Sequence, residues 1–379
     1  MRRIVSSLAL AFLLALPVAS QDTTSSDDTA ATPGATADAS VPDPGLSVSG
    51  PLSVVTVNAW SGLEADGFFS RGSYEEPAAR EFRLRRLADG IAALEPDIVT
   101  LGEANPVDGM AASFSEALGM SAVSHMAEGG VRIGPVGLPT NLREGDIILA
   151  REAALPSFAA RRTLAGGYVG RTVSLQTGET TQVLGVELVV EGRSVYVFHT
   201  RWFASPFATR DDMVELIEAY GDGELASEEL IDRMDRAVRG KERRLEEARR
   251  TIVTINEVAG DAPVILTGTL NALPGSEEIA MLEEAGFVDA FAWARGSTTA
   301  AGVSAGATWD PGRNTHITRH GLGPWEDEAA ARIDYVFVRG AGVEVAEARV
   351  VLSEATYGVF PSSHFGVLAR ITIPQGGTP

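Results

Sequence analysis

The sequence predicts an α/β or α+β sandwich, in which layers of β-strands are covered by helices. Short apolar runs rich in Val and Ile recur along the chain, and such runs are typical of buried strands. Helical blocks lie between these runs, and one of them carries apolar residues at helical spacing. With 379 residues, of which 45% are hydrophobic, the chain is long enough to bury a large core.

The N-terminal segment has the composition of an export signal. Arg2 and Arg3 precede an apolar run over residues 4–16, and small residues follow up to Ser20. The apolar run is too short to span a membrane, and no other stretch approaches a transmembrane segment. Residues 1–20 are therefore predicted to be a signal peptide that directs the protein to the bacterial periplasm or the extracellular space.

Residues 21–50 are rich in Ser, Thr, Asp, Ala and Pro and contain almost no large apolar side chain. Such a segment cannot bury enough surface to offset the entropy lost on ordering, so a disordered linker is predicted. Its role is open between a spacer that holds the domain away from the cell envelope and a permissive tail, and the tail is favoured. The folded domain is expected over residues 51–379.

The charge and cysteine content restrict the partners and the source of stability. The formal net charge is −20 at pH 7, and loss of the predicted signal removes two more positive charges. This balance argues against long-range steering onto DNA or anionic lipid, but it does not exclude an anionic substrate held locally by Arg or a metal ion. The chain has no Cys and forms no disulfides, so its stability comes from the core, and a monomer is expected.

The first half of the folded domain is predicted to begin with a strand, a helix and a second strand. Residues 52–57 and 98–101 are apolar runs of strand length. Between them, residues 77–94 carry apolar side chains at helical spacing. Residues 145–150 and 181–190 predict two further strands.

The second half contains a long helical block. Residues 211–258 are predicted to be mostly helical with a break at residues 221–223. Arg and Glu alternate in the later part of this block, which indicates a solvated helix face rather than a surface for a phosphate backbone. Further strands are predicted at residues 194–198, 264–266, 332–338 and 366–373.

Polar residues follow the predicted strands, where a sheet gathers the side chains of an active site. Each has an ordinary explanation on its own, such as an exposed loop acid for Glu103 or a capped turn histidine for His364. Asp334 is harder to explain, because a carboxylate inside an apolar strand needs a partner. Thr269 and Asn271 are expected to share a face, as residues i and i+2 of a strand do. The full set is Asn58, Glu103, His199, Arg201, Thr269, Asn271, Asp334 and His364.

Six motifs occur in order between residues 51 and 372: VVTVNAW, EPDIVTLGEAN, VYVFHTRW, VILTGTLNALP, RIDYVFV and SSHFGV. Together they resemble the endonuclease/exonuclease/phosphatase superfamily, which includes deoxyribonuclease I, exonuclease III and sphingomyelinases. The resemblance implies a four-layered sandwich of two mixed β-sheets flanked by helices, with the active site at one edge.

The resemblance also implies hydrolysis of a phosphoester with a divalent cation, Mg²⁺ or Mn²⁺. Asn58 matches the family's first-strand Asn and Glu103 its metal-binding Glu, so these two are the implied metal residues. Asn271 matches an Asn that donates to phosphate. Asp334 and His364 match the catalytic Asp and His of the last two motifs.

Three positions depart from the family pattern, because Arg201 replaces a His and Thr269 and Ser363 each replace an Asp. In the family these residues bind phosphate, orient the attacking water, ligate metal and polarise the last His. Since a positioned acid–base group contributes roughly 10²–10⁴ in rate, these losses are large enough to silence catalysis. In partial compensation, His199 is expected to approach the phosphate while Arg201 clamps it.

Two other groups have open interpretations. His316 and His320 are either nitrogen ligands for another metal or surface loop histidines, and the second is favoured. Aromatic residues near the expected site either stack on a ligand or pack at its rim. These are Trp60, Trp202, Phe203 and Phe207.

Two functional hypotheses therefore stand about level. The first is an exported metal-dependent phosphoester hydrolase with an atypical site. The second is a pseudoenzyme that retains the fold as a binding module for a phosphorylated ligand, a lipid head group or an envelope partner. A purely structural domain is a weaker third. The acidic charge favours a small phosphoester or a lipid head group over duplex DNA.

Overall fold

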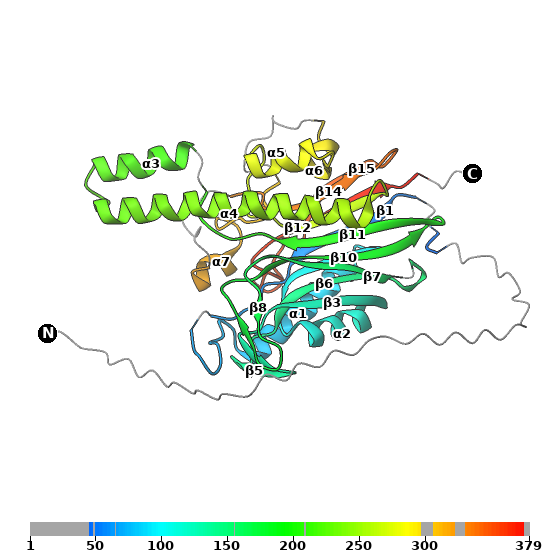
Figure 1. The fold of residues 1–379 in the computed structure, drawn as a ribbon, viewed down its shortest axis with the longest axis horizontal. Coiled ribbons are helices and arrows are strands. Elements are labelled where there is room, and N and C mark those ends of the chain that lie inside the picture. The colour runs from blue at the N-terminus through cyan, green and yellow to red at the C-terminus, as the bar shows by residue number, and fades with distance from the viewer. Residues whose placement is uncertain are drawn as a thin grey trace, which may run out of the picture. The chain divides into compact units, whose positions relative to one another are not determined.

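Two six-stranded β-sheets pack face to face, and helices cover the outer side of each (Figure 1). The computed structural model describes residues 45–47, 50–64, 66–154, 156–207, 210–296, 306–322 and 330–374, which all belong to one compact unit, Asp43–Pro379. The predicted signal peptide and most of the predicted linker lie outside the described residues. Leu46 falls within the predicted linker but is buried and pairs with Val190, so packing begins before residue 51.

The first sheet has the strand order β15-β16-β1-β2-β6-β3. Strand β1 is parallel to β2, and the other neighbours are antiparallel, so the sheet is mixed. The bounds are β1 (Leu52–Asn58), β2 (Ile98–Ala104), β3 (Met120–Glu128), β6 (Glu144–Arg151), β15 (Glu344–Val351) and β16 (Gly366–Thr372).

The second sheet has the strand order β13-β14-β12-β11-β10-β7 and is also mixed, because β11 is parallel to β12. Its strands are β7 (Ser157–Ala165), β10 (Thr181–Val190), β11 (Arg193–Arg201), β12 (Val264–Thr269), β13 (Val288–Asp289) and β14 (Asp334–Arg339). A small third sheet contains β4 (Val131–Ile133), β5 (Val136–Leu138), β8 (Tyr168–Val169) and β9 (Ser174–Gln176).

Three apolar clusters give the layers their order. The central cluster joins the inner faces of the two sheets, for example Val54 of β1 with Val197 of β11. A second cluster packs the first sheet against α1 (Pro77–Ala92) and α2 (Val107–Leu118). A third packs the second sheet against α4 (Ser227–Ala259) and α5 (Glu277–Glu284). The predicted four-layered sandwich is confirmed.

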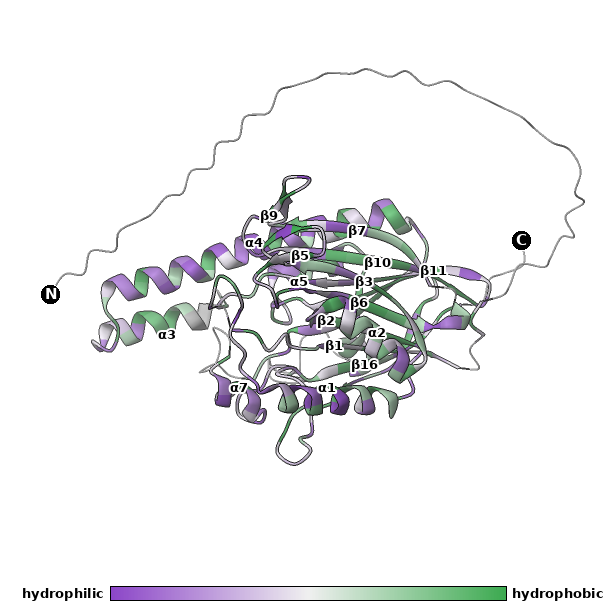
Figure 2. Cartoon of the chain, turned by 90° about the horizontal axis from the view of Figure 1, so that it is seen from below, coloured by the Kyte–Doolittle hydropathy of each residue, from purple (hydrophilic) through white to green (hydrophobic). Residues whose placement is uncertain are grey.

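The remaining helices are α3 (Arg210–Gly221), α6 (Ala290–Ala294), α7 (Thr315–His320) and a 3-10 turn, η1 (Glu152–Ala154). Helices α3 and α4 replace the predicted block at residues 211–258 and separate near the predicted break. Figure 2 shows that α4 alternates hydrophilic and hydrophobic residues, as its Arg- and Glu-rich sequence predicts for a half-exposed helix. Among the described residues, no helix is both long and apolar enough to cross a membrane.

The parallel pairs decide where the polar strand ends meet. Because β1 and β2 are parallel, their C-terminal residues lie at one edge of the first sheet. The same holds for β11 and β12 in the second sheet. Strand β14 is antiparallel to β12, so the first residue of β14 joins the last residue of β12 at that edge.

Candidate active site

Strand register places three candidate residues side by side across the second sheet. Arg201, the last residue of β11, pairs with Thr269, the last residue of β12. Thr269 in turn pairs with Asp334, the first residue of β14. Gly268 precedes Thr269 with φ of +146°, and an added Cβ would lie 1.8 Å from the Thr200 carbonyl oxygen, so only Gly fits this close approach of strands.

Thr269, Asp334 and His364 form a buried hydrogen-bonded trio. The Thr269 hydroxyl donates to Asp334 Oδ1 over 2.6 Å, and His364 Nδ1 lies 2.8 Å from Asp334 Oδ2. Both carboxylate oxygens of Asp334 therefore have a partner, as a buried carboxylate requires. Burial alone would lower the pKa of His364, but the Asp334 carboxylate outweighs it and raises that pKa.

A bulge in the first sheet turns Glu103 toward the second sheet. The β2–β6 register shifts between Leu101 and Ala104, and Glu103 has φ of +51°. Bulges of this kind redirect a side chain at a sheet edge. The Glu103 carboxylate consequently reaches Arg201, with 3.3 Å between Oε1 and Nη1.

Arg201 contacts three carboxylates in all. Besides Glu103, its Nη2 lies 3.2 Å from Oε1 of Glu144, the first residue of β6. Its Nη1 lies 3.7 Å from Oε1 of Glu179, in the loop before β10. Burial would lower the pKa of Arg201, but these three acids raise it well above its ordinary value. Arg201 therefore stays charged and joins the two sheets at the site.

Burial makes the charged form of these carboxylates unfavourable. It raises the pKa of Glu144 to about 8; Arg201 lowers this pKa in part, and Glu103 raises it further. Burial also raises the pKa of Glu179. One guanidinium thus balances only part of the negative charge that these acids would carry, and proton binding offsets some of the rest.

The two asparagines are held by backbone groups. Asn58 Oδ1 accepts from the Trp60 amide over 2.9 Å, and Asn58 Nδ2 is buried and has no hydrogen-bond partner among the described residues. Asn271 Nδ2 donates to the Trp202 carbonyl over 2.8 Å. Since Asn271 lies beyond β12 with φ of +49°, strand alternation does not govern its side chain, and the reasoning from a shared strand face does not apply.

His199 does not lie at the open edge. It is 1% exposed, and its Nδ1 lies 3.1 Å from the Thr267 hydroxyl between the two sheets. Its Nε2 is 3.8 Å from Asp146 Oδ1 and makes no hydrogen bond among the described residues. Burial lowers the pKa of His199 to about 3, so it is a neutral core residue beneath the site.

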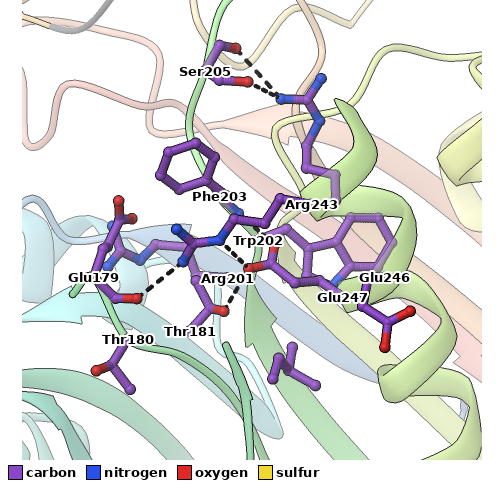
Figure 3. A network of polar contacts seen from close by, with 12 residues as sticks. Glu179, Thr180, Thr181, Arg201, Trp202, Phe203, Ser205, Arg243, Glu246 and Glu247 are labelled. Atoms are coloured by element: carbon purple, nitrogen blue, oxygen red, sulfur yellow. Dashed lines mark hydrogen bonds and ion pairs between the residues drawn. The ribbon is translucent and has the colours of Figure 1, made fainter. Parts of the chain in front are cut away.

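Helix α4 contacts the segment that follows Arg201 (Figure 3). Glu247 of α4 accepts hydrogen bonds from the Phe203 amide over 2.7 Å and from the Thr181 hydroxyl over 2.6 Å. Arg243 contacts Glu247 at 3.0 Å and also donates to the Glu179 carbonyl over 3.0 Å. One buried glutamate thereby holds both the segment that follows Arg201 and the start of β10.

The remaining candidates are packed rather than open. His316 is buried and lies 4.3 Å from the Trp60 ring and 4.7 Å from the His320 ring, in an aromatic cluster. The favoured interpretation of His316 as a surface loop histidine is therefore wrong. Burial lowers its pKa to about 3. Trp60, Trp202 and Phe207 are also buried, which excludes them as exposed stacking surfaces in this conformation.

Ser363 is buried, and its backbone carbonyl accepts a hydrogen bond from Asn314 Nδ2 over 2.9 Å. The surface has cavities of about 250 and 300 Å³. The first includes Phe207 and Ala272, and the second includes Asn105. None of the trio of Thr269, Asp334 and His364 lines either cavity.

The implied divalent cation does not fit the residues as they stand. The Glu103 carboxylate is paired with Arg201, and the Asn58 side-chain oxygen accepts from a backbone amide. Within the described ranges, no group of three or more His, Cys, Asp or Glu side chains is arranged to hold a metal ion. The guanidinium of Arg201 lies among the acids instead.

Sequence reasoning missed Glu144 and Glu179. Glu144 directly precedes the predicted strand at residues 145–150 and opens β6, a position that resembles the other polar strand ends, so this signal was available. Glu179 lies in a loop with no periodicity, and only the three-dimensional arrangement brings it to Arg201.

Comparison with known proteins supports the fold. D. rerio TDP2, humanised by mutation, has 16% identity and a TM-score of 0.53, covering 85% of this chain and 99% of its own. A Bacteroides vulgatus endonuclease/exonuclease/phosphatase has 14% identity and a TM-score of 0.54, with coverages of 85% and 99%. A Bacteroides thetaiotaomicron mannosyl-6-phosphatase has 14% identity and a TM-score of 0.50, with coverages of 85% and 100%. At these identities the structures show the fold alone.

No curated protein matches the chain. A model of the Endonuclease/Exonuclease/phosphatase family matches residues 55–364, which is most of the chain. The match spans every strand that carries a candidate residue, and the structure has the layers that the six motifs imply. The chain therefore belongs to the Endonuclease/Exonuclease/phosphatase family.

Proposed function

We propose that the protein binds a phosphate ester at the edge formed by β1, β12 and β14 and that it has lost efficient hydrolysis. The observation that carries the proposal is the Thr269–Asp334 hydrogen bond of 2.6 Å. Thr269 has a hydroxyl where the family resemblance implies a carboxylate, and this hydroxyl donates its hydrogen bond to Asp334. Without that carboxylate, an attacking water lacks a base to orient it.

Donors for an anion remain at the same edge. The buried Asn58 Nδ2 has no partner among the described residues. An acceptor such as a phosphate oxygen would remove the free-energy cost of this unsatisfied donor. Asp334 raises the pKa of His364, which favours the protonated and positively charged imidazole. Charge-assisted hydrogen bonds of this kind suit phosphate.

The compounds named for similar structures support a phosphate ester as the ligand class. One structure of D. rerio TDP2 is complexed with a single-strand DNA product, and another neighbour is a mannosyl-6-phosphatase. DNA and a sugar phosphate both contain a phosphate esterified to a sugar. The net charge of −20 favours a small phosphoester or a lipid head group over duplex DNA.

The second candidate function is metal-dependent hydrolysis with an atypical site, using Mg²⁺ or Mn²⁺. The His364–Asp334 contact of 2.8 Å favours it, since a carboxylate that orients a histidine is a working part of many hydrolytic sites. Thr269 and the pairing of Glu103 with Arg201 oppose it.

Binding and turnover separate the two functions. The purified protein is titrated by calorimetry with p-nitrophenyl phosphate, phosphocholine and a single-stranded oligonucleotide. We expect one of these probes to bind. We expect His364→Gln to raise its dissociation constant about tenfold, which corresponds to the loss of one charge-assisted hydrogen bond. Glu152→Gln, on the exposed turn after β6, is the matched control. No binding by any probe contradicts the proposal, and turnover of bis-p-nitrophenyl phosphate with Mg²⁺ or Mn²⁺ favours the second function.

We also propose that the protein is exported and acts as a monomer. The charged and apolar start of the sequence supports export. Expression in a bacterial host, followed by fractionation and N-terminal sequencing, tests it. A mature N-terminus near residue 21 in the periplasm is expected, and an intact Met1 in the cytoplasm would refute export.

A further inference from the structure

The Arg201 guanidinium lies where carboxylates from three separate segments meet. Glu103 lies at the bulge of β2, Glu144 is the first residue of β6, and Glu179 lies in the loop before β10. The first two belong to one sheet and Arg201 to the other. The N–O distances of 3.2–3.7 Å place all three acids around a single cation.

This arrangement differs from the buried ion pair of Arg244 and Glu278, whose side chains are 2% and 3% exposed and lie 3.1 Å apart. That pair is balanced, because one guanidinium faces one carboxylate at ion-pair distance. Around Arg201 the acids outnumber the cation, so the carboxylates repel one another wherever the guanidinium does not screen them.

We propose that Arg201 is the built-in cation of this site, holding the carboxylates together in place of a divalent metal ion. Glu103, which the family resemblance implies as a metal ligand, has its carboxylate on the guanidinium. A divalent ion added to the wild-type site would have to displace or approach a fixed positive charge. The wild-type protein therefore does not bind Mg²⁺ or Mn²⁺ here, whether or not a phosphate ester binds at the neighbouring residues.

Removal of the guanidinium should convert the cluster into a cation site. In Arg201→Met, the side chain keeps much of its apolar length and loses its charge. Glu103, Glu144 and Glu179 then face one another without a counterion. Carboxylate oxygens together with waters are the ligands that Mg²⁺ and Mn²⁺ accept.

The test is a titration of the full chain with Mn²⁺, followed by electron paramagnetic resonance of the free ion and by thermal unfolding. Wild type is expected to show no stoichiometric Mn²⁺ site. Arg201→Met is expected to bind Mn²⁺ at least about tenfold more tightly than wild type, which the loss of one neighbouring unit charge supports at an effective dielectric constant of about 20. Mn²⁺ should also raise its melting temperature.

Two variants isolate the cause. Arg244→Met removes another buried arginine, which is paired with one acid, and it should gain no Mn²⁺ binding. Arg201→Met combined with Glu103→Gln should lose most of the gain. Equal Mn²⁺ affinity in Arg201→Met and Arg244→Met would overturn the proposal.

The wild-type titration keeps the proposal falsifiable if Arg201→Met does not fold. A stoichiometric Mn²⁺ site in wild type that Glu103→Gln abolishes contradicts a built-in cation. Absence of that site, with normal folding of Arg201→Lys, supports it. Neither readout involves a phosphate ester, so the result is independent of ligand binding and turnover.

Discussion

Thr269 shows how one side chain changes the chemistry of the whole edge. Its hydroxyl satisfies one oxygen of Asp334 while His364 satisfies the other. An acid at this position would place a second carboxylate beside Asp334 in a site that is almost closed to water. The trio is thus self-consistent as a structural unit, with a hydroxyl at the position where the family resemblance implies a carboxylate.

Thr269→Val tests the structural part of this hydrogen bond. Valine keeps the shape of threonine but leaves Asp334 Oδ1 without its donor. The free energy of unfolding should therefore fall by about 1–3 kcal/mol. Thr269→Ser keeps the hydroxyl and serves as the control. Urea denaturation measures both variants, and a loss in Thr269→Ser as large as in Thr269→Val would show that the hydroxyl does not matter.

Glu144 gives a pH dependence with a definite sign. Burial raises its folded-state pKa to about 8 from an ordinary 4.5, so the folded protein binds this proton more tightly than the unfolded chain. Its contribution to stability is present at low pH and is lost as the pH rises toward 8. Relative to Glu144→Gln, wild type should therefore lose stability between about pH 5 and about pH 8.

Melting temperatures of both proteins across this pH range test the prediction. Glu152→Gln changes an exposed acid just beyond the same strand, and it should follow the wild-type profile. Parallel curves for wild type and Glu144→Gln would mean that Glu144 titrates normally.

The sequence located many site residues but not their contacts. Asn58, Glu103, Arg201, Thr269 and Asp334 were recognisable because each follows or opens an apolar strand. The burial of His199 was not predictable from alternation, since both faces of β11 are covered by neighbouring layers. The acid cluster around Arg201 also depends on long-range packing that no local pattern encodes.

At the scale of elements, α4 links the helical layer to the site. Its buried Glu247 accepts hydrogen bonds from the Phe203 amide and the Thr181 hydroxyl. Arg243, which pairs with Glu247, donates to the Glu179 carbonyl (Figure 3). The loop after β11 is therefore held from the helix rather than by the sheet alone. These contacts hold Phe203, two residues after Arg201, and the backbone of Glu179, one of the acids that Arg201 contacts.

Glu247→Ala should destabilise the protein by about 1–3 kcal/mol for each donor that loses its acceptor, namely the Thr181 hydroxyl and the Phe203 amide. Glu246→Ala is the matched control, one residue earlier on the same helix with an exposed carboxylate. It should stay within about 0.5 kcal/mol of wild type, as surface substitutions do. Chemical denaturation compares them, and similar losses in both variants would argue against a role for the buried network.

Prediction of the elements succeeded where the pattern was strong. Strand β10 has the predicted bounds, and α1, β1 and β6 differ from the predicted ranges by only one or two residues at an end. Strand β7 was missed because it is half exposed and mixes Arg with apolar residues. The short helices α5, α6 and α7 were missed because segments of 5–8 residues show too little periodicity.

At the scale of the whole molecule, the four layers bring one edge of each sheet together. Glu103 and Glu144 come from the first sheet, while Arg201, Thr269 and Asp334 come from the second. The family fold is retained in full, and the departures concentrate at this edge. The packing of the layers accounts for the fold, but the fold by itself does not decide whether the protein hydrolyses a phosphoester.

The most direct test is turnover of bis-p-nitrophenyl phosphate with saturating Mn²⁺, compared between wild type and Glu103→Ala. A site whose acid is paired with Arg201 and whose water-orienting carboxylate is absent should release p-nitrophenol no faster than the variant. Equal, background-level rates are the predicted result. Wild-type turnover that Glu103→Ala abolishes would contradict the loss of hydrolysis and show a working metal-dependent site.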